Sequence, residues 1–147
     1  MKTKAFKTLS IAASSGKVGF VFLIENELLD WGLSVKASKS PELAAKQAKK
    51  WIDYYQPDLI ITEKITTHSR KSAHNHAVIR AIADEAVDAD AQHIEVDRVQ
   101  EYANKYAEAE ALGAIYPTIS NWVPKKRKLW EAEPKNMVLF EALSFMK

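Results

Sequence analysis

The sequence predicts an α/β fold: a mixed five-stranded sheet, with three antiparallel strands followed by parallel strands, flanked by helices. Two observations support this prediction. Three strand-like segments at residues 8–12, 18–24 and 28–33 are separated only by short turns, which favours an antiparallel meander. After residue 40, helical and strand-like segments alternate, as they do where helices connect parallel strands.

The first three strands are predicted from apolar patterning and from turn residues. Leu9 and Ile11 alternate with smaller side chains, and Ala-Ser-Ser-Gly at residues 13–16 supplies a turn. A long apolar run then gives the second strand. This run breaks at Glu25 and Asn26, after which the chain resumes as the third strand.

A helix and a buried strand come next. Ser40 is a capping residue and Pro41 is a favoured first-turn residue, so we expect a helix from there to about Gln56. Residues 59–61 form a short, uniformly apolar run, which is typical of a parallel strand buried on both faces. This strand places Glu63 at its carboxyl end.

The alternation continues through the middle of the chain. Residues 65–76 are polar and are expected to form a loop that leads into a helix with an apolar face at residues 78–86. Residues 93–96 are expected to form the fifth strand. A further helix is predicted from the shared face of Val99, Tyr102, Ala103 and Tyr106.

Beyond this helix the pattern is less regular. Residues 112–124 contain Gly113 and Pro117 as breakers and are predicted to be irregular. The last helix is expected to begin near Glu133 and Pro134. Its apolar stripe consists of Leu139, Ala142, Leu143 and Met146.

Composition limits the class of protein. With 147 residues, 47% hydrophobic and 27% charged, the chain is expected to form one globular domain over residues 1–147. The absence of cysteine excludes disulfides, thiol catalysis and cysteine-ligated metal centres. No apolar run approaches the roughly 20 residues of a membrane helix, and the basic start leads into a strand, so a soluble, cytoplasmic protein is expected.

Three segments together resemble the family of RuvC-type Holliday junction resolvases. They read LSIAASSGKVGF at residues 9–20, PDLIITE at residues 57–63 and WEAEPKN at residues 130–136. Their order and spacing extend the resemblance over nearly the whole chain. The resemblance implies a ribonuclease H-like fold and a metal-dependent, structure-specific endonuclease that cuts branched DNA such as four-way junctions.

The resemblance also implies which positions hold metal. The glutamate that ends the fourth strand corresponds to Glu63, and the acidic pair of the last helix corresponds to Glu133 and Asn136. The first-strand aspartate corresponds to Ala12, whose methyl group coordinates nothing. Hydrolysis of phosphodiesters by this route uses two ions about 3.5–4 Å apart, so an intact site would take two Mg²⁺ or Mn²⁺ ions on hard oxygen ligands.

Three explanations of Ala12 remain open. The position carries an inactivating Asp→Ala change, or the protein is a relative that binds nucleic acid without cutting it. In the third explanation the assigned register is wrong or another acid replaces the missing aspartate, and the sequence offers Glu95, Asp97 and Glu131. The function predicted first is therefore a resolvase-like endonuclease inactivated at Ala12, and the alternative is a catalytically inactive nucleic-acid-binding protein of the same fold.

Basic residues indicate where DNA would bind. A run at residues 125–128 lies between Trp122 and Trp130, and basic clusters with aromatic neighbours suit phosphates and unpaired bases. The polar loop and the first turn of the resolvase-like pattern add further candidates. The residues predicted to contact branched DNA are Ser14, Ser15, Lys17, Arg70, Lys71, Lys125, Lys126, Arg127 and Lys128.

Other readings of the sequence are weaker. In the resolvase family the helix after the fourth strand contributes to a dimer, which implies a homodimer through residues 77–86, but packing of this stripe on its own sheet explains the pattern equally well. His68, His74 and His76 lack the i, i+4 spacing of helical zinc sites. An ATP-using relative is disfavoured because the chain has no phosphate-binding loop of the Gly-x-x-x-x-Gly-Lys type.

Overall fold

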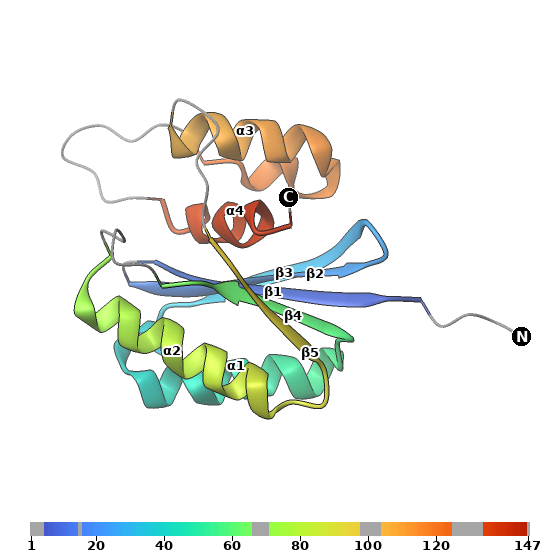
Figure 1. Ribbon diagram of the computed structural model, residues 1–147. Coiled ribbons are helices and arrows are strands. Elements are labelled where there is room, and N and C mark those ends of the chain that lie inside the picture. Colours follow the sequence, from blue (N-terminus) through green and yellow to red (C-terminus); the bar gives the residue numbers. More distant parts are fainter. Residues whose placement is uncertain (1–4, 15, 66–70, 98–103, 125–133, 147) are drawn as a thin grey trace, which may run out of the picture.

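A computed structural model describes residues 5–14, 16–65, 71–97, 104–124 and 134–146. At its centre is a five-stranded sheet in the order β3-β2-β1-β4-β5 (Figure 1). Strands β1, β2 and β3 form an antiparallel meander, and β4 and β5 run parallel to β1, which confirms the predicted mixed sheet. The strands are β1 (Lys7–Ser14), β2 (Lys17–Ile24), β3 (Glu27–Ser34), β4 (Leu59–Glu63) and β5 (Gln92–Val96).

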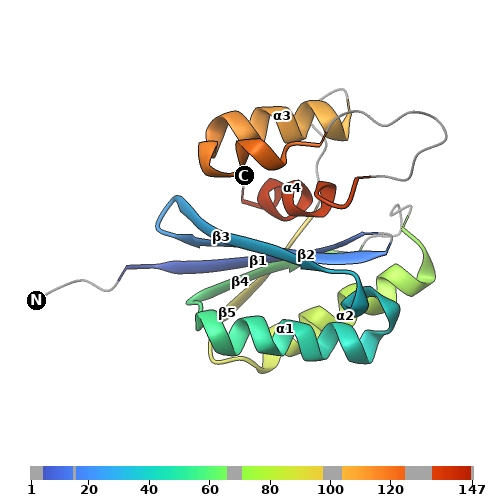
Figure 2. The same ribbon diagram turned by 180° about the vertical axis from the view of Figure 1, so that it is seen from behind.

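Helices cover both faces of this sheet. Figures 1 and 2 show α1 (Pro41–Tyr55) and α2 (Ala73–Asp88) on one face and α4 (Met137–Ser144) on the other. Helix α3 (Lys105–Ile115) lies on the far side of α4 from the sheet. Two short 3-10 helices, η1 (Lys36–Lys39) and η2 (Pro117–Trp122), precede α1 and follow α3. Within the described residues, no helix is both long and apolar enough to cross a membrane.

The predicted start of α1 is confirmed in detail. The Ser40 hydroxyl accepts a hydrogen bond from the Leu43 amide at 3.1 Å, and Pro41 occupies the first turn. Helix α2 is capped in the same way, since the Ser72 hydroxyl accepts from the Asn75 amide at 3.1 Å. These caps satisfy amide groups that have no partner inside a helix.

Alternation along the strands divides the apolar residues into two cores. In β1, Leu9, Ile11 and Ala13 face α1 and α2, whereas Ser10, Ala12 and Ser14 face α4. The apolar stripe predicted at residues 78–86 packs against this same sheet and α1, because Val78, Ile79, Ile82 and Ala86 are buried in the first core.

Aromatic stacking fixes α1 on the sheet. The Phe20 ring lies 4.6 Å from that of Trp51, and the Phe22 ring lies 4.5 Å from that of Tyr55. The Tyr55 hydroxyl donates to the Asp30 carboxylate, and burial together with this carboxylate raises the pKa of Tyr55. The neighbouring Tyr54, by contrast, is 79% exposed.

Two predicted boundaries were wrong. Helix α3 continues to Ile115, although the sequence predicts irregular structure from residue 112. The breaker Gly113 is inside this helix because it allows close contact: a Cβ there would lie 2.5 Å from Cγ2 of Val123. Helix α4 begins at Met137, later than predicted, because the residues before it form a turn in which Met137 N–H bonds to the Pro134 carbonyl. Part of the helix predicted at residues 99–106 lies outside the described residues.

Candidate active site

The carboxyl ends of β1 and β4 lie next to each other. The two strands are parallel, with Ser10 opposite Ile61, so Ala12 and Glu63 follow two residues later on each strand. Both side chains belong to the face covered by α4, because Ala12 and Ile61 are part of the second core and strand residues two apart share a face. The sheet therefore brings the Ala12 and Glu63 positions together on the face covered by α4.

A third acidic residue comes from α4. Glu141 is 3% exposed and Glu63 is 6% exposed, and the Lys71 ammonium joins them. Lys71 Nζ lies 2.9 Å from Glu63 Oε1 and donates a further hydrogen bond to Glu141 Oε1. It also donates to the Ala13 carbonyl at 2.7 Å. One ammonium thus links the end of β1, the end of β4 and the middle of α4.

The charges in this cluster shift the titration of Glu63. Burial raises the pKa of the Glu63 carboxyl, Lys71 lowers it, and the nearby Glu141 raises it again. The net direction is upward from the ordinary value, because the loss of hydration outweighs the single ammonium.

Ala12 lies under α4 in close packing. It is 1% exposed and pairs with Gly19 on β2. A Cβ on Gly19 would lie 2.6 Å from Cγ1 of Val138, so the small residues allow α4 to approach the sheet here. On the same strand face, the Ser10 hydroxyl donates to the Ala142 carbonyl at 2.7 Å and anchors α4.

Ser14 adds a buried polar atom at the end of β1. Ser14 is 5% exposed, and its hydroxyl oxygen has no hydrogen-bond partner among the described residues. By alternation it lies on the same face of β1 as Ala12. The end of β1 beneath α4 is therefore polar at Ser14 and apolar at Ala12.

One of the two predicted last-helix ligands, Asn136, contacts another part of the chain. Asn136 precedes α4, and its side-chain amide donates to the Trp122 carbonyl at 3.3 Å. Glu133 lies outside the described residues. Of the acids considered as replacements, Glu95 pairs in register with Thr62, which puts it on the opposite face of the sheet from Glu63. Asp97 is exposed just beyond β5, and Glu131 lies outside the described residues.

Some of the residues predicted to contact DNA lie within the described part of the chain and others lie outside it. Lys17 is 6% exposed, and the Lys71 ammonium, predicted to contact phosphate, bonds to carboxylates and to a backbone carbonyl. Two buried acids attract this lysine more strongly than solvent does. Ser15, Arg70, Lys125, Lys126, Arg127 and Lys128 lie outside the described residues, and their contacts with DNA stay predictions.

Glu141 is the site residue that the sequence analysis missed. The signal was present: Glu141 is the only charged residue in the segment of α4, which is otherwise apolar apart from Ser144. Every residue of this helix is buried, so no solvent-facing side was available for an acid. A single carboxylate in a helix that is apolar all round indicates a buried partner.

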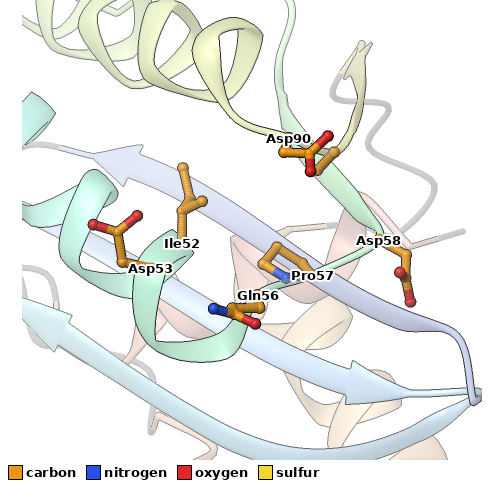
Figure 3. Close-up of a pocket in the computed structure, with 7 residues that line it drawn as sticks. Ile52, Asp53, Gln56, Pro57, Asp58 and Asp90 are labelled. Atoms are coloured by element: carbon orange, nitrogen blue, oxygen red, sulfur yellow. The ribbon is translucent and has the colours of Figure 1, made fainter.

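A hollow lies at the other end of the sheet. Its volume is about 500 Å³, and it is lined by Asp53, Gln56, Asp58 and Asp90 together with apolar neighbours (Figure 3). A smaller hollow beside it adds Glu85 and Asp88, together with Lys49, which pairs with Asp53. The amino ends of β4 and β5 thus carry a negative surface that repels phosphates, whereas the carboxyl ends hold the Lys71 cluster.

Strand order and helix placement together define a ribonuclease H-like fold. The fold is that of Thermus thermophilus RuvC, with a TM-score of 0.62 and 11% identity over 95% of this chain and 92% of that one. Fowlpox virus Holliday junction resolvase is similar as well, with a TM-score of 0.61 and 16% identity over 96% of this chain and 95% of that one.

Junction-bound structures are also among the similar folds. The fowlpox virus resolvase in complex with its substrate Holliday junction DNA has a TM-score of 0.60 and 14% identity over 95% of this chain and 93% of that one. No protein-family model matches the chain, and no curated protein matches it in sequence. The likeness to the resolvases therefore lies in the fold.

The donor set of the described residues does not fit a two-ion centre. Two ions need several oxygen ligands between them, and here Glu63 and Glu141 supply the two carboxylates while Ala12 supplies none. Across the described ranges, no three His, Cys, Asp or Glu side chains form a group that could hold a metal ion. The cation between the carboxylates is the Lys71 ammonium.

Proposed function

We propose that the protein binds branched DNA, with four-way junctions as the preferred form. The observation that carries this proposal is the buried acidic pair of Glu63 and Glu141 at the carboxyl ends of β1 and β4, in a fold that junction resolvases share. Burying two carboxylates and a lysine costs hydration free energy that an apolar cluster would avoid, which supports a role for these acids beyond packing.

Recognition would depend on shape and on phosphates. Phosphate contacts position a protein on DNA without reading sequence, and the geometry of a four-way junction supplies the selectivity. The acidic hollow around Asp53, Asp58 and Asp90 disfavours DNA at the amino ends of the strands. Bound DNA is therefore expected at the carboxyl ends, where the basic run at residues 125–128 would add contacts.

For the reaction, we infer a structure-specific endonuclease whose present form is disabled at Ala12. A carboxylate at this position would stand beside Glu63 on the face that carries Glu141, which gives three acids where two are present. The Ala12→Asp variant is expected to cut junctions with Mg²⁺ or Mn²⁺. Glu133 stays a predicted ligand, and Glu141 takes the part that the sequence analysis gave to Asn136.

The second candidate is a binding protein without catalysis. Two observations favour it: Ala12 is closely covered by α4, and an ammonium already compensates the acidic pair. In this case junction binding is expected and no variant at position 12 restores cutting. A homodimer and a cytoplasmic location are predictions that apply to both candidates.

The two candidates separate in one experiment on a folded Ala12→Asp background. Glu141→Gln removes one acid of the cluster, and Glu110→Gln removes an exposed acid of α3 as a matched control. The nuclease proposal predicts cutting that Glu141→Gln abolishes and Glu110→Gln leaves unchanged. Equal cutting by both double variants would contradict it, and junction binding without any cutting would favour the binding protein.

A further inference from the structure

We propose that Lys71 is a built-in replacement for a metal ion, which holds Glu63 and Glu141 together without any divalent cation. In a metal-dependent nuclease of this fold, the acids at the end of the fourth strand and in the last helix would share a metal. Here the structure assigns that place to the lysine ammonium. The inference concerns the apo protein and stands whether or not the protein binds DNA.

The contacts of Lys71 match those of a bound cation. Its ammonium meets a carboxylate from β4, a carboxylate from α4 and the backbone carbonyl of Ala13. All three are hard oxygen atoms, the ligand type that Mg²⁺ and Mn²⁺ take in proteins. In the parent chain, where Ala12 adds no further carboxylate, a positive group between these oxygens opposes the binding of a divalent ion by its charge.

Burial makes this cation necessary. Both carboxylates are at least nine-tenths buried, and the Lys71 side chain is 20% exposed. Two neighbouring carboxylates at such a position repel each other and lack full hydration, so the fold requires a positive charge between them. The ammonium provides this charge at all times, whereas a metal would provide it only when bound.

Ala12 belongs to the same explanation. An aspartate here would add a third negative charge beside the pair, and one ammonium would then be insufficient to balance the cluster. With a methyl group at this position, the cluster holds two carboxylates instead of three, so it needs less positive charge. The alanine and the lysine thus act together: the first lowers the demand for positive charge, and the second supplies it.

The first test is Mn²⁺ binding by the parent chain without DNA. Paramagnetic broadening of backbone amide signals is followed during titration, because it reports where the ion sits. The parent is expected to show no selective broadening at Glu63 and Glu141, even where millimolar Mn²⁺ broadens signals of the acidic hollow at Asp58 and Asp90. Selective broadening at Glu63 and Glu141 in the parent would overturn the proposal.

The second test removes the ammonium. Lys71→Met leaves both acids in place and is expected to bind Mn²⁺ at the pair at least about tenfold more tightly than the parent, because a unit charge in direct contact no longer opposes the ion. The added ion is also expected to raise the Tm of this variant and not that of the parent. A folded Lys71→Met chain that gains no Mn²⁺ binding at the pair would overturn the proposal.

Controls make the result specific to the cluster. Lys64→Met removes an exposed lysine next to Glu63 and is expected to leave Mn²⁺ binding as in the parent. Glu141→Gln in the Lys71→Met background is expected to abolish the gain. If Lys71→Met fails to fold, Lys71→Gln keeps a hydrogen-bond donor at this place while removing the charge, and the same gain is expected from it.

Discussion

Gly19 and Val138 lie so close together that a Cβ on Gly19 would be 2.6 Å from Cγ1 of Val138. This contact seats α4 on the sheet directly above the pair of Ala12 and Gly19. Because Glu141 is carried by α4, the distance between Glu141 and Glu63 depends on how deeply this helix sits. The glycine on β2 therefore helps to position the acidic cluster, although it has no part in the chemistry.

Gly19→Ala is expected to destabilise the fold by about 1–3 kcal/mol, the usual effect of extra volume in a packed core. Urea unfolding of the variant and the parent measures this. Val138→Ala in the same chain makes room for the new methyl group, so the double variant should be more stable than the sum of the single changes predicts. Strictly additive changes in the free energy of unfolding would show that the two side chains are not in steric conflict.

Removing the Lys71 charge is expected to be costly. Lys71→Met removes the ammonium that both buried carboxylates bind, and breaking a buried ion pair typically costs about 3–5 kcal/mol in the free energy of unfolding. Lys49→Met serves as the control, because Lys49 and Asp53 form an exposed ion pair at 3.4 Å, for which less than about 1 kcal/mol is expected. Denaturant unfolding in the absence of divalent ions compares the two. A loss of similar size in both variants would contradict the role given to Lys71.

Glu63 is expected to make stability depend on pH. Its pKa in the folded protein is raised above the ordinary value of 4.5. In the window above that value the folded state holds a proton that the unfolded state has released, so the free energy of unfolding falls as pH rises through it. Glu63→Gln removes this contribution.

The measurement is the difference in unfolding free energy between parent and Glu63→Gln across this window. Relative to the variant, the parent should lose stability as pH rises from about 4.5. A parent that gains stability relative to Glu63→Gln over the same range would mean that Lys71 outweighs burial, and that the folded pKa of Glu63 is lowered.

DNA binding is expected to depend on salt through the basic run at residues 125–128. Changing Lys125, Lys126, Arg127 and Lys128 to alanine should reduce the slope of log K against log salt by up to about 0.9 for each lost phosphate contact. Changing Lys46, Lys49 and Lys50, exposed on α1, removes charge of the same sign away from the predicted DNA surface. Fluorescence anisotropy with a labelled junction measures both slopes. If both sets of changes reduced the slope equally, the DNA would not bind preferentially at residues 125–128.

Much of the fold could be predicted because local signals and tertiary packing agree. Ser40 and Pro41 start a helix for reasons contained in a few residues, and the uniformly apolar β4 could be recognised from its neighbours in sequence. The position of Glu63 at the carboxyl end of β4 could be predicted from the same strand. Gly113 misled the prediction because its helix tolerates glycine for a contact with Val123, which is ten residues away and invisible to local patterning.

The candidate site was only partly predictable, for a different physical reason. The resemblance to resolvases implied Glu133 and Asn136 as last-helix ligands, and Glu133 stays a prediction. In the structure α4 begins at Met137 and brings Glu141 to the Lys71 ammonium that also binds Glu63. The depth at which α4 sits, set by Gly19 and Ser10, decides which residue reaches the strand ends. Lys71 could not be assigned either, since its partners come from three segments distant in sequence.

The central claim is that Glu63 and Glu141 belong to a junction-cutting centre disabled at Ala12. The most direct measurement is cleavage of an end-labelled four-way DNA junction in Mg²⁺ and Mn²⁺ by the parent and by a folded Ala12→Asp variant, with cut positions mapped on all four strands. Only Ala12→Asp is expected to cut, at symmetric positions near the branch. Cutting by the parent, or tight junction binding by both proteins with no cutting by either, would contradict this claim.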